Sequence, residues 1–301
     1  MEIIRPGTAI PFTKYRNIAV ALSTLVNLAV LVLLITKGPN MGVDFAGGTV
    51  VQLKFQQKVS IADIRRTLTP IGLGDSVIQD FGETSSNEFL VRLERTAIEL
   101  GALGEKIRGA LAAQFGEKQV EIRRVESVGP KVGKELRERA TWSVIAATFM
   151  MGVYIWFRFE LRFGVGAVIA LIHDVLVTIG ALVLAQYEFD LTIVAALLTI
   201  VGFSVNDTVI VCDRIRENMR KSKRVGLEMV INTSINETLS RTIITTGTAL
   251  LVLVALFVLG GAVIRPFAFA LMVGFFSGVY STIFIASPVI LLWEKGKKPH
   301  K

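Results

Sequence analysis

The chain has 301 residues, of which 52% are hydrophobic and only 19% are charged. Soluble domains usually carry about 25% charged residues, so the composition indicates a protein in contact with lipid. The net charge of +8 would also suit a nucleic-acid-binding protein. The basic residues, however, cluster in short segments beside apolar runs, as in the cytoplasmic loops of membrane proteins. No stacking aromatic residues accompany them, which argues against a nucleic-acid partner.

Neither a disulfide nor a metal site is expected. Cys212 is the single cysteine, so no intramolecular disulfide can form, and we interpret it as a small hydrophobic residue in a helix interface. The two histidines, His173 and His300, lie far apart, and the sequence contains no cluster of metal ligands. It also lacks the H-E-x-x-H and G-x-S-x-G motifs of hydrolases. An enzyme is therefore the least expected class.

The chain begins with a segment that we expect to be a cytoplasmic N-terminus, residues 1–17, followed by a first membrane span over residues 18–36. The apolar run Ile18–Ile35 has 18 residues, which extend about 27 Å as a helix and nearly cover a bilayer core of about 30 Å. A signal peptide would have a shorter apolar core followed by a cleavage site of small residues. The run therefore predicts an uncleaved span.

Residues 37–139 are predicted to form a water-soluble α+β domain, because acidic and basic residues are frequent there and nearly balanced. The spacing of apolar residues predicts six elements in the order β-α-β-β-α-β. These elements cover Thr49–Phe55, Ile61–Leu68, Ser76–Phe81, Glu88–Leu93, Ile98–Phe115 and Val120–Val125. Ser60 is placed to cap the first helix, and Gly116 to end the second. The order is that of a ferredoxin-like split βαβ unit.

Residues 140–301 are predicted to form a membrane domain of five helices with a cytoplasmic C-terminal tail. Five long apolar runs in succession argue against buried helices of a soluble protein. The expected spans are residues 140–157, 163–186, 191–212, 241–262 and 267–293, with a cytoplasmic segment at 213–240. Gly274 and Gly278 in the last span are spaced to let another helix approach, which makes them a candidate contact with a partner chain.

The predicted fold is thus a polytopic α-helical membrane protein with six transmembrane helices and an external ferredoxin-like (βαββαβ) domain between the first two. Lys and Arg gather in the segments that lie inside if the N-terminus is cytoplasmic, and the short outer turns carry only Arg265. Both termini are therefore expected in the cytoplasm, and the soluble domain outside it. We interpret the basic run Arg214–Arg224 as a topology determinant that contacts lipid headgroups.

Asp207 is a charged residue inside an apolar run, where a charge costs about 2.5–3.5 kcal/mol on insertion scales. Counting inward along the fourth and fifth spans places Asp207 and Arg241 at similar depth, so the two could meet. Arg241 also lies on a polar helix face, because residues recur there at spacings of three, four and three. That face consists of Thr238, Arg241, Thr245 and Thr248. The other polar residues expected to support the pair are Ser204, Asn206, Thr208, His173 and Asp174.

Two interpretations of Asp207 and Arg241 stay open. Desolvation favours the neutral form of a carboxyl group and a nearby Arg favours its charged form, so changing water access could switch the protonation of Asp207 in a proton relay. The alternative is a static ion pair that fixes helix packing. For His173 and Asp174, which lies near the bilayer centre, a hydrogen-bonded packing contact explains the pair equally well.

Several motifs, in order along the chain, resemble the SecD/SecF family of protein-export proteins. Residues 42–49, GVDFAGGT, look like the opening of that family after its first span, and residues 128–133, VGPKVG, look like its matching element before the second. His173-Asp174, Asn206–Val209 and Asp213–Glu217 are similar to SecF-type chains in particular. The resemblance covers nearly the whole chain. One departure is Ala46, where many relatives have Thr.

The resemblance implies a subunit of the bacterial inner membrane that pairs with SecD and assists the SecYEG translocon in exporting a translocating polypeptide. Proton flow would drive the process within the resistance-nodulation-division (RND) architecture, with protons as the coupling ion and no other cofactor. The family's proton pathway uses an Asp in span four and an Arg in span five, and these motif positions fall on Asp207 and Arg241. The alternatives are a small-molecule proton antiporter subunit of the RND type and a non-conducting scaffold for SecD.

Overall fold

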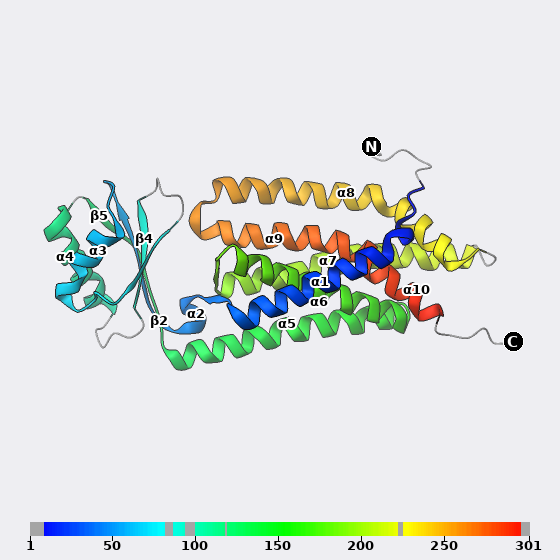
Figure 1. Cartoon of the computed structure of the whole chain (residues 1–301), viewed down its shortest axis with the longest axis horizontal. Helices are drawn as coiled ribbons and strands as arrows, with labels where there is room; N and C mark the ends of the chain where they lie inside the picture. The colour runs from blue at the N-terminus through cyan, green and yellow to red at the C-terminus, as the bar shows by residue number, and fades with distance from the viewer. Residues whose placement is uncertain (1–8, 82–86, 94–99, 118, 222–224, 296–301) are drawn as a thin grey trace. The chain divides into compact units, whose positions relative to one another are not determined.

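In the computed structural model, residues 9–81, 87–93, 100–117, 119–221 and 225–295 are described. The chain divides into two compact units (Figure 1). One is an α/β unit made of residues 41–140 and 189–191, and the other is a helical unit made of the rest. Helix α5 (Pro130–Arg158) and helix α7 (Leu191–Lys221) begin in the α/β unit and continue into the helical unit.

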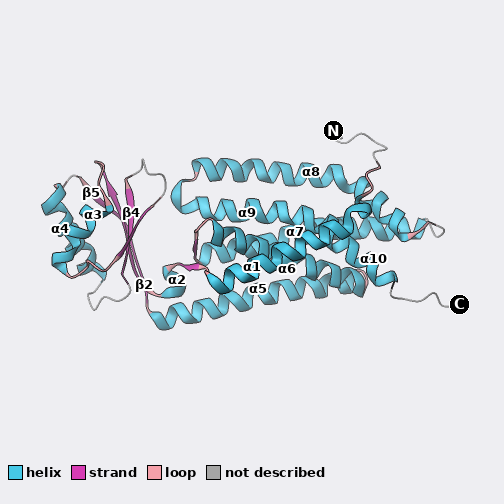
Figure 2. Ribbon diagram, viewed as in Figure 1, coloured by secondary structure: helices cyan, strands magenta, loops and turns pink. Residues whose placement is uncertain are grey.

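The α/β unit contains a four-stranded antiparallel sheet (Figure 2). Its strands are β2 (Gly48–Phe55), β3 (Val77–Asp80), β4 (Glu88–Leu93) and β5 (Val120–Val128). They lie in the order β3-β4-β2-β5, so β2 pairs with a neighbour along both edges. The register with β5 shifts between Gln52 and Leu53, which marks a β-bulge on that edge of the sheet.

Two amphipathic helices cover one face of this sheet, α3 (Ile61–Leu68) and α4 (Leu100–Phe115). Their apolar side chains, such as Ile64 and Ile107, form a core with alternate residues of the strands, such as Leu53 and Val91. The predicted order of strands and helices is confirmed element by element. The first two residues of the predicted second helix, and most of the turn expected at 82–87, lie outside the described residues.

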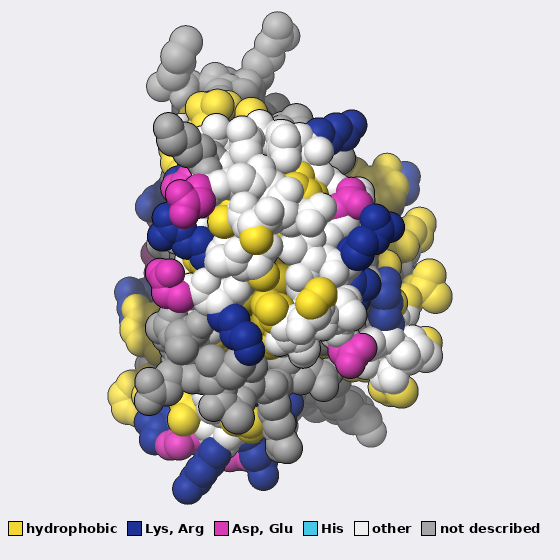
Figure 3. Space-filling model, turned by 90° about the vertical axis from the view of Figure 1, so that its left-hand side faces the viewer, with side chains coloured by type: hydrophobic (Ala, Val, Ile, Leu, Met, Phe, Trp, Pro, Cys, Tyr) yellow, Lys and Arg dark blue, Asp and Glu magenta, His cyan; other side chains and the backbone are white. Residues whose placement is uncertain are grey.

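The predicted start of the first helix and the predicted end of the second are also confirmed. Ser60 precedes α3, and its hydroxyl accepts a hydrogen bond from Asp63 N at 3.2 Å, as an N-cap does. Gly116, with φ of +97°, follows α4. Short elements complete the unit. They are β1 (Asn40–Met41), α2 (Val43–Ala46), η2 (Thr69–Ile71) and β6 (Glu188–Phe189). On the face of the unit seen in Figure 3, side chains of both charges are interspersed, as on an ordinary solvated surface.

The described residues contain six helices long and apolar enough to cross a membrane, as the sequence predicted. After the short η1 (Phe12–Tyr15), the first is α1 (Arg16–Thr36), and α5 is the second. The next are α6 (Leu161–Leu184), α7 and α8 (Leu227–Leu259). The last is composite, with α9 (Gly261–Ser281), the π-helical segment η3 (Thr282–Ala286) and α10 (Ser287–Lys295). The sequence predicted no such π-helical segment.

Several helices extend well beyond the apolar spans expected from hydropathy. Helix α5 begins ten residues before position 140. Helix α7 continues to Lys221 and α8 begins at Leu227, so most of the segment expected as a separate connection at 213–240 is helical. Hydropathy marks only the apolar part of a helix, whereas the ends are held by pairs of opposite charge one turn apart. Glu217 with Lys221, at 2.6 Å, is one such pair.

The last transmembrane helix packs closely on α7 through its glycines. A Cβ at Gly274 would lie 2.3 Å from Ile200 Cδ1, and a Cβ at Gly278 would lie 3.2 Å from Ser204 Cβ. The prediction that these two glycines let another helix approach is confirmed, but that helix is α7 of the same chain and not a partner chain. Small residues allow this close approach because helices in lipid associate through direct packing.

Candidate functional site

Asp207 lies within α7, and only 4% of its surface is exposed. Its Oδ1 accepts a hydrogen bond from Thr242 Oγ1 on α8 at 3.2 Å. Its other oxygen, Oδ2, is buried and has no hydrogen-bond partner among the described residues. A buried carboxylate oxygen without a partner is costly unless the group is protonated or meets water or another chain. Asp207 is therefore a carboxyl group with one oxygen left for a proton or a further ligand.

The polar face of α8 differs from the one expected. Arg241, Thr245 and Thr248 are exposed, and both of those threonine hydroxyls donate to backbone carbonyls of α8 itself. No ion pair joins Arg241 to Asp207 among the described residues. The buried polar positions of α8 are spaced by four residues instead. They are Ser234, Thr238, Thr242 and Thr246.

The sequence indicated a polar face on α8 but not the buried one. The buried Thr242 and Thr246 each follow by one residue the expected Arg241 and Thr245. Neighbouring residues on a helix differ in direction by about 100°, so Arg241 and Thr242 point to different surroundings. Thr246 Oγ1, one turn from Thr242, is buried without a partner among the described residues. The asparagine before Asp207, Asn206, is exposed and lies away from this contact. A recurrence of Thr at intervals of four was the signal that could have identified the buried face.

Asp174 on α6 is the centre of a second polar cluster, and it is fully buried. Its Oδ2 accepts hydrogen bonds from Ser204 Oγ at 2.7 Å and from Ser281 Oγ at 2.8 Å. Its Oδ1 accepts one from Ser277 Oγ at 2.6 Å and lies 3.2 Å from His173 Nδ1. Three hydroxyl groups and an imidazole from α6, α7 and α9 therefore surround this carboxyl group.

The two carboxyl groups are linked through α7. Ser204, which donates to Asp174, lies one turn before Thr208 on that helix, and Thr208 Oγ1 lies 2.9 Å from Thr282 Oγ1 of η3. The polar patch expected on α7 at Ser204, Asp207 and Thr208 is buried throughout. Each of its members contacts a different neighbour, however, so the patch divides among α6, α8 and η3. Ser277, Ser281 and Thr282 were not predicted from the sequence.

An apolar cavity of about 540 Å³ lies beside the Asp174 cluster. It is bounded by side chains of α1, α6, α8 and α9, and His173 and Ser277 form part of its lining. The ring of Tyr280 stacks on His173 with centroids 5.8 Å apart. The Tyr280 hydroxyl lies 2.9 Å from Ser23 Oγ on α1. Helix α1 is thereby joined to the same polar cluster.

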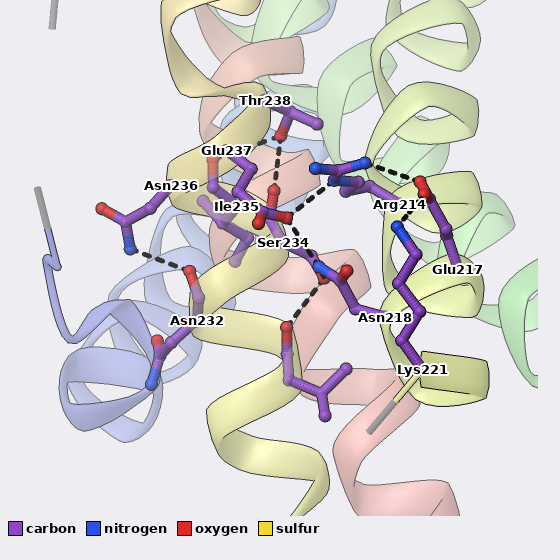
Figure 4. Close-up of polar contacts among 11 residues, drawn as sticks. Arg214, Glu217, Asn218, Lys221, Asn232, Ser234, Ile235, Asn236, Glu237 and Thr238 are labelled. Carbon is purple, nitrogen blue, oxygen red and sulfur yellow. Dashed lines mark hydrogen bonds and ion pairs between the residues drawn. The ribbon is translucent and has the colours of Figure 1, made fainter. Parts of the chain in front are cut away.

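A charged network joins the ends of α7 and α8 that are connected by residues 222–226 (Figure 4). Arg214 donates to Glu237 Oε2 at 2.7 Å and to Glu217 Oε2 at 2.6 Å. Asn218 also donates to Glu237 Oε2, at 2.6 Å. The basic run that begins at Arg214 therefore forms specific ion pairs within the chain. Its expected contact with lipid headgroups stays a prediction.

The N-terminal segment is bound to α8 next to this network. Asn236 accepts a hydrogen bond from Ile10 N at 3.0 Å and donates one to Ile10 O at 2.9 Å. Asn232 accepts from Thr13 N and donates to Thr13 Oγ1. These paired amide contacts fix the segment before α1 against α8, and the sequence predicted no such contact.

The fold and the buried acids define a multi-pass membrane protein with one small α/β unit, and comparisons with known proteins identify its class. Residues 108–296 match the family described as "Protein export membrane protein SecD/SecF, C-terminal". Residues 32–59, which include the glycine-rich segment, match the "SecD/SecF GG Motif".

Individual relatives narrow the class. The chain is 48% identical over 291 residues to the protein translocase subunit SecF of Desulfurispirillum indicum, which covers 95% of this chain and 92% of the relative. It is 46% identical over 301 residues to the SecF subunit of Magnetococcus marinus, with 99% and 96% covered. The chain therefore belongs to the SecF family of protein translocase subunits.

A solved structure extends this likeness to the fold. The crystal structure of SecDF from Thermus thermophilus, described as a translocon-associated membrane protein, matches with a TM-score of 0.84 and 35% identity. The match covers 96% of this chain but only 39% of the SecDF chain. A second SecDF structure, in a super-membrane-facing form, gives a TM-score of 0.72. This chain is thus similar to one part of a longer SecDF chain.

Proposed function

We propose that this chain pairs with SecD and assists the SecYEG translocon in protein export across the bacterial inner membrane, using the proton-motive force. The support is its membership of the SecF family together with its likeness to SecDF, which is described as translocon-associated. The coupling ion would be the proton, with no other cofactor. Both termini would be cytoplasmic and the α/β unit extracytoplasmic, as the distribution of Lys and Arg favours.

Asp207 is the proposed proton-carrying group, and its unpartnered Oδ2 is the observation that carries this proposal. A carboxyl group with every oxygen hydrogen-bonded has little reason to change its charge. Asp207 has one hydrogen bond and a buried free oxygen, so its charged form depends on what reaches Oδ2. Water access from one side would favour release of the proton, and closure would favour its uptake.

Arg241 would act in this relay through its charge. Arg241 immediately precedes Thr242 in the chain, and its side chain lies on a side of α8 that this chain leaves exposed. An Arg within or at the edge of an apolar span is expected to face water, a headgroup or another protein. We propose that SecD covers this face, which also carries Thr245 and Thr248. In the assembled complex Arg241 would then favour the charged form of Asp207.

Asp174, with His173, is proposed as a supporting group. Four contacts already surround its carboxylate. Its proposed role is therefore to hold α6, α7 and α9 together in fixed positions. The interpretation of this pair as a packing contact is therefore favoured over a proton-carrying one. A non-conducting scaffold would need no free oxygen at Asp207. A small-molecule antiporter of the RND type would need a substrate pocket in the external domain, for which a unit of about a hundred residues has little room.

The test is export in cells that carry Asp207→Asn as the only copy of the subunit. We expect loss of proton-motive-force-stimulated export, with normal membrane insertion and normal co-purification of SecD. Asp213→Asn is the matched control, because Asp213 lies on the same helix but is exposed. If Asp207→Asn exported as well as wild type, the relay would be refuted and the scaffold favoured. Small-molecule efflux that depends on Asp207 would instead favour the antiporter.

A further inference from the structure

The glycine-rich segment between β1 and β2 holds the first residue of α7. Gly42 N donates to Phe189 O at 2.7 Å, and a Cβ at Gly42 would lie 2.8 Å from that oxygen. Asp44 Oδ2 accepts a hydrogen bond from Leu191 N at 3.0 Å. Leu191 begins α7, and the first N–H groups of a helix have no partner inside the helix. Asp44 therefore supplies a partner for the start of α7 from a position 147 residues earlier in the chain.

The same segment is packed tightly against the first turn of α5. A Cβ at Gly47, where φ is +75°, would lie 2.9 Å from Pro130 Cα. A Cβ at Gly133 would lie 3.2 Å from Phe45 O in α2. The side chain of Phe45 is buried. Helix α2 thus has little freedom to shift independently, and β2, one of the two inner strands of the sheet, follows it after Gly47.

Helix α7 connects this contact to Asp207. Asp207 lies sixteen residues after Leu191, which is about 24 Å along a continuous helix. A carboxylate near a helix N-terminus is favoured by the helix dipole, so the side chain of Asp44 suits its place. A shift of α7 along its axis would change the distance from Leu191 N to Asp44 Oδ2.

We propose that Asp44 is a positioning residue that transmits movement of α7 to β2 of the α/β unit. Asp44 and Gly42 together bind the residues that lead into α7, and the packing of α2 passes their displacement to the strand. The inference rests on the proposed function, because it takes Asp207 as the group that moves α7. Asp44 itself carries no transported proton in this scheme.

The test uses the full chain with its SecD-type partner in cells and as the purified complex. Asp44→Ala removes the acceptor for Leu191 N, and Asp44→Asn keeps an acceptor oxygen but removes the charge. Ser60→Ala is the matched control, because it removes a helix N-cap in the same unit without contact to α7. Two quantities are measured, the stimulation of export by the proton-motive force and the amide hydrogen exchange of residues 48–55.

We expect Asp44→Ala to lower stimulated export by about fivefold or more, the lower end of the usual range for coupling between sites. Asp44→Asn should have a smaller defect, and Ser60→Ala none. The double variant of Asp44→Ala with Asp207→Asn should export no worse than Asp207→Asn alone. Asp207→Asn should also alter exchange in β2 when Asp44 is present and leave it unchanged when Ala replaces Asp44.

The outcomes separate this inference from the proposed function. If Asp207→Asn abolished stimulated export while both Asp44 variants exported as wild type, Asp44 would not be the link and the relay would stand. Equal losses in Asp44→Ala and Ser60→Ala would show that Asp44 only stabilises the unit, which would also overturn the inference. If Asp207→Asn itself exported normally, the proposed function would fail and the link would fail with it. Where Asp44→Ala does not accumulate, the Asn variant decides by the same criteria.

Discussion

Replacing Asp174 by Asn should lower the stability of the protein without abolishing export. The carboxylate of Asp174 accepts hydrogen bonds from three serine hydroxyls and contacts His173. Asn keeps one acceptor oxygen but presents an NH₂ group where the other oxygen accepted two hydrogen bonds. The two hydroxyls that donated to that oxygen, those of Ser204 and Ser281, must either rotate to accept a hydrogen bond from the NH₂ group or lose their partner. The variant should therefore fold less stably while keeping any function that does not need the charge of Asp174.

The magnitude follows from the contacts. A hydrogen bond to a charged group contributes about 1.5–3 kcal/mol, and two such bonds are reversed or lost, with some recovery when the hydroxyls rotate. We expect Asp174→Asn to lower the stability of the helical unit by about 2–4 kcal/mol. Asp207→Asn can keep the hydrogen bond from Thr242, because an amide oxygen also accepts, and it replaces an oxygen that has no partner among the described residues. It should change stability by less than about 1 kcal/mol.

The assay is thermal unfolding of the purified protein in detergent, followed by a probe of helix packing. Asp174→Asn should lower the unfolding temperature by several degrees, whereas Asp207→Asn should leave it nearly unchanged and lose stimulated export. Equal unfolding temperatures for the two variants would refute the assignment of Asp174 to packing. A stable Asp174→Asn variant without export would indicate that Asp174 carries protons as well.

Three further changes test the packing. Gly274→Ala should destabilise the protein by about 1–3 kcal/mol, because the added Cβ overlaps Ile200. Gly247→Ala is the control and should not destabilise it, because Gly247 has open space around it. An equal effect of the two substitutions in unfolding experiments would contradict the close approach. Glu237→Gln removes the partly exposed ion pair at the end of α7 and should lower stability by about 0.5–1 kcal/mol, with a smaller effect at high salt. Asn236→Ala removes both hydrogen bonds to Ile10 and should speed exchange of amides 9–15, so unchanged exchange would argue against that contact.

The sequence predicted the α/β unit well because its signals are local. Ser60 lies where a helix N-cap must lie, Gly116 lies where a residue with positive φ ends a helix, and β4 alternates between buried and half-buried positions. Each signal depends on a few neighbouring residues, and the structure satisfies each one. The number of membrane helices was also predictable, since about twenty apolar residues are needed to cross a bilayer.

The site was only half predictable because it depends on helix rotation. Hydropathy shows that Asp207 and Arg241 lie at similar depth, but it does not show which way each side chain points. Thr242, one residue further, contacts Asp207, and Arg241 faces outward. The serines around Asp174 were missed for a related reason. Ser277 and Ser281 are ordinary small residues in a membrane helix, and only the position of α6 makes them ligands of a carboxylate.

Helix α7 is the element on which the separate observations converge. At its first residue it is bound by Asp44 in the α/β unit, and near its last turns it is bound by Glu237 of α8. Between these ends Ser204 joins α7 to the saturated Asp174 cluster, while Asp207 keeps a free oxygen. The change of charge proposed for Asp207 would therefore occur in a helix that is held by hydrogen bonds near both ends and in its middle. Such a helix can respond by a small shift as one body, and the hydrogen bond to Asp44 is where that shift would first reach the α/β unit.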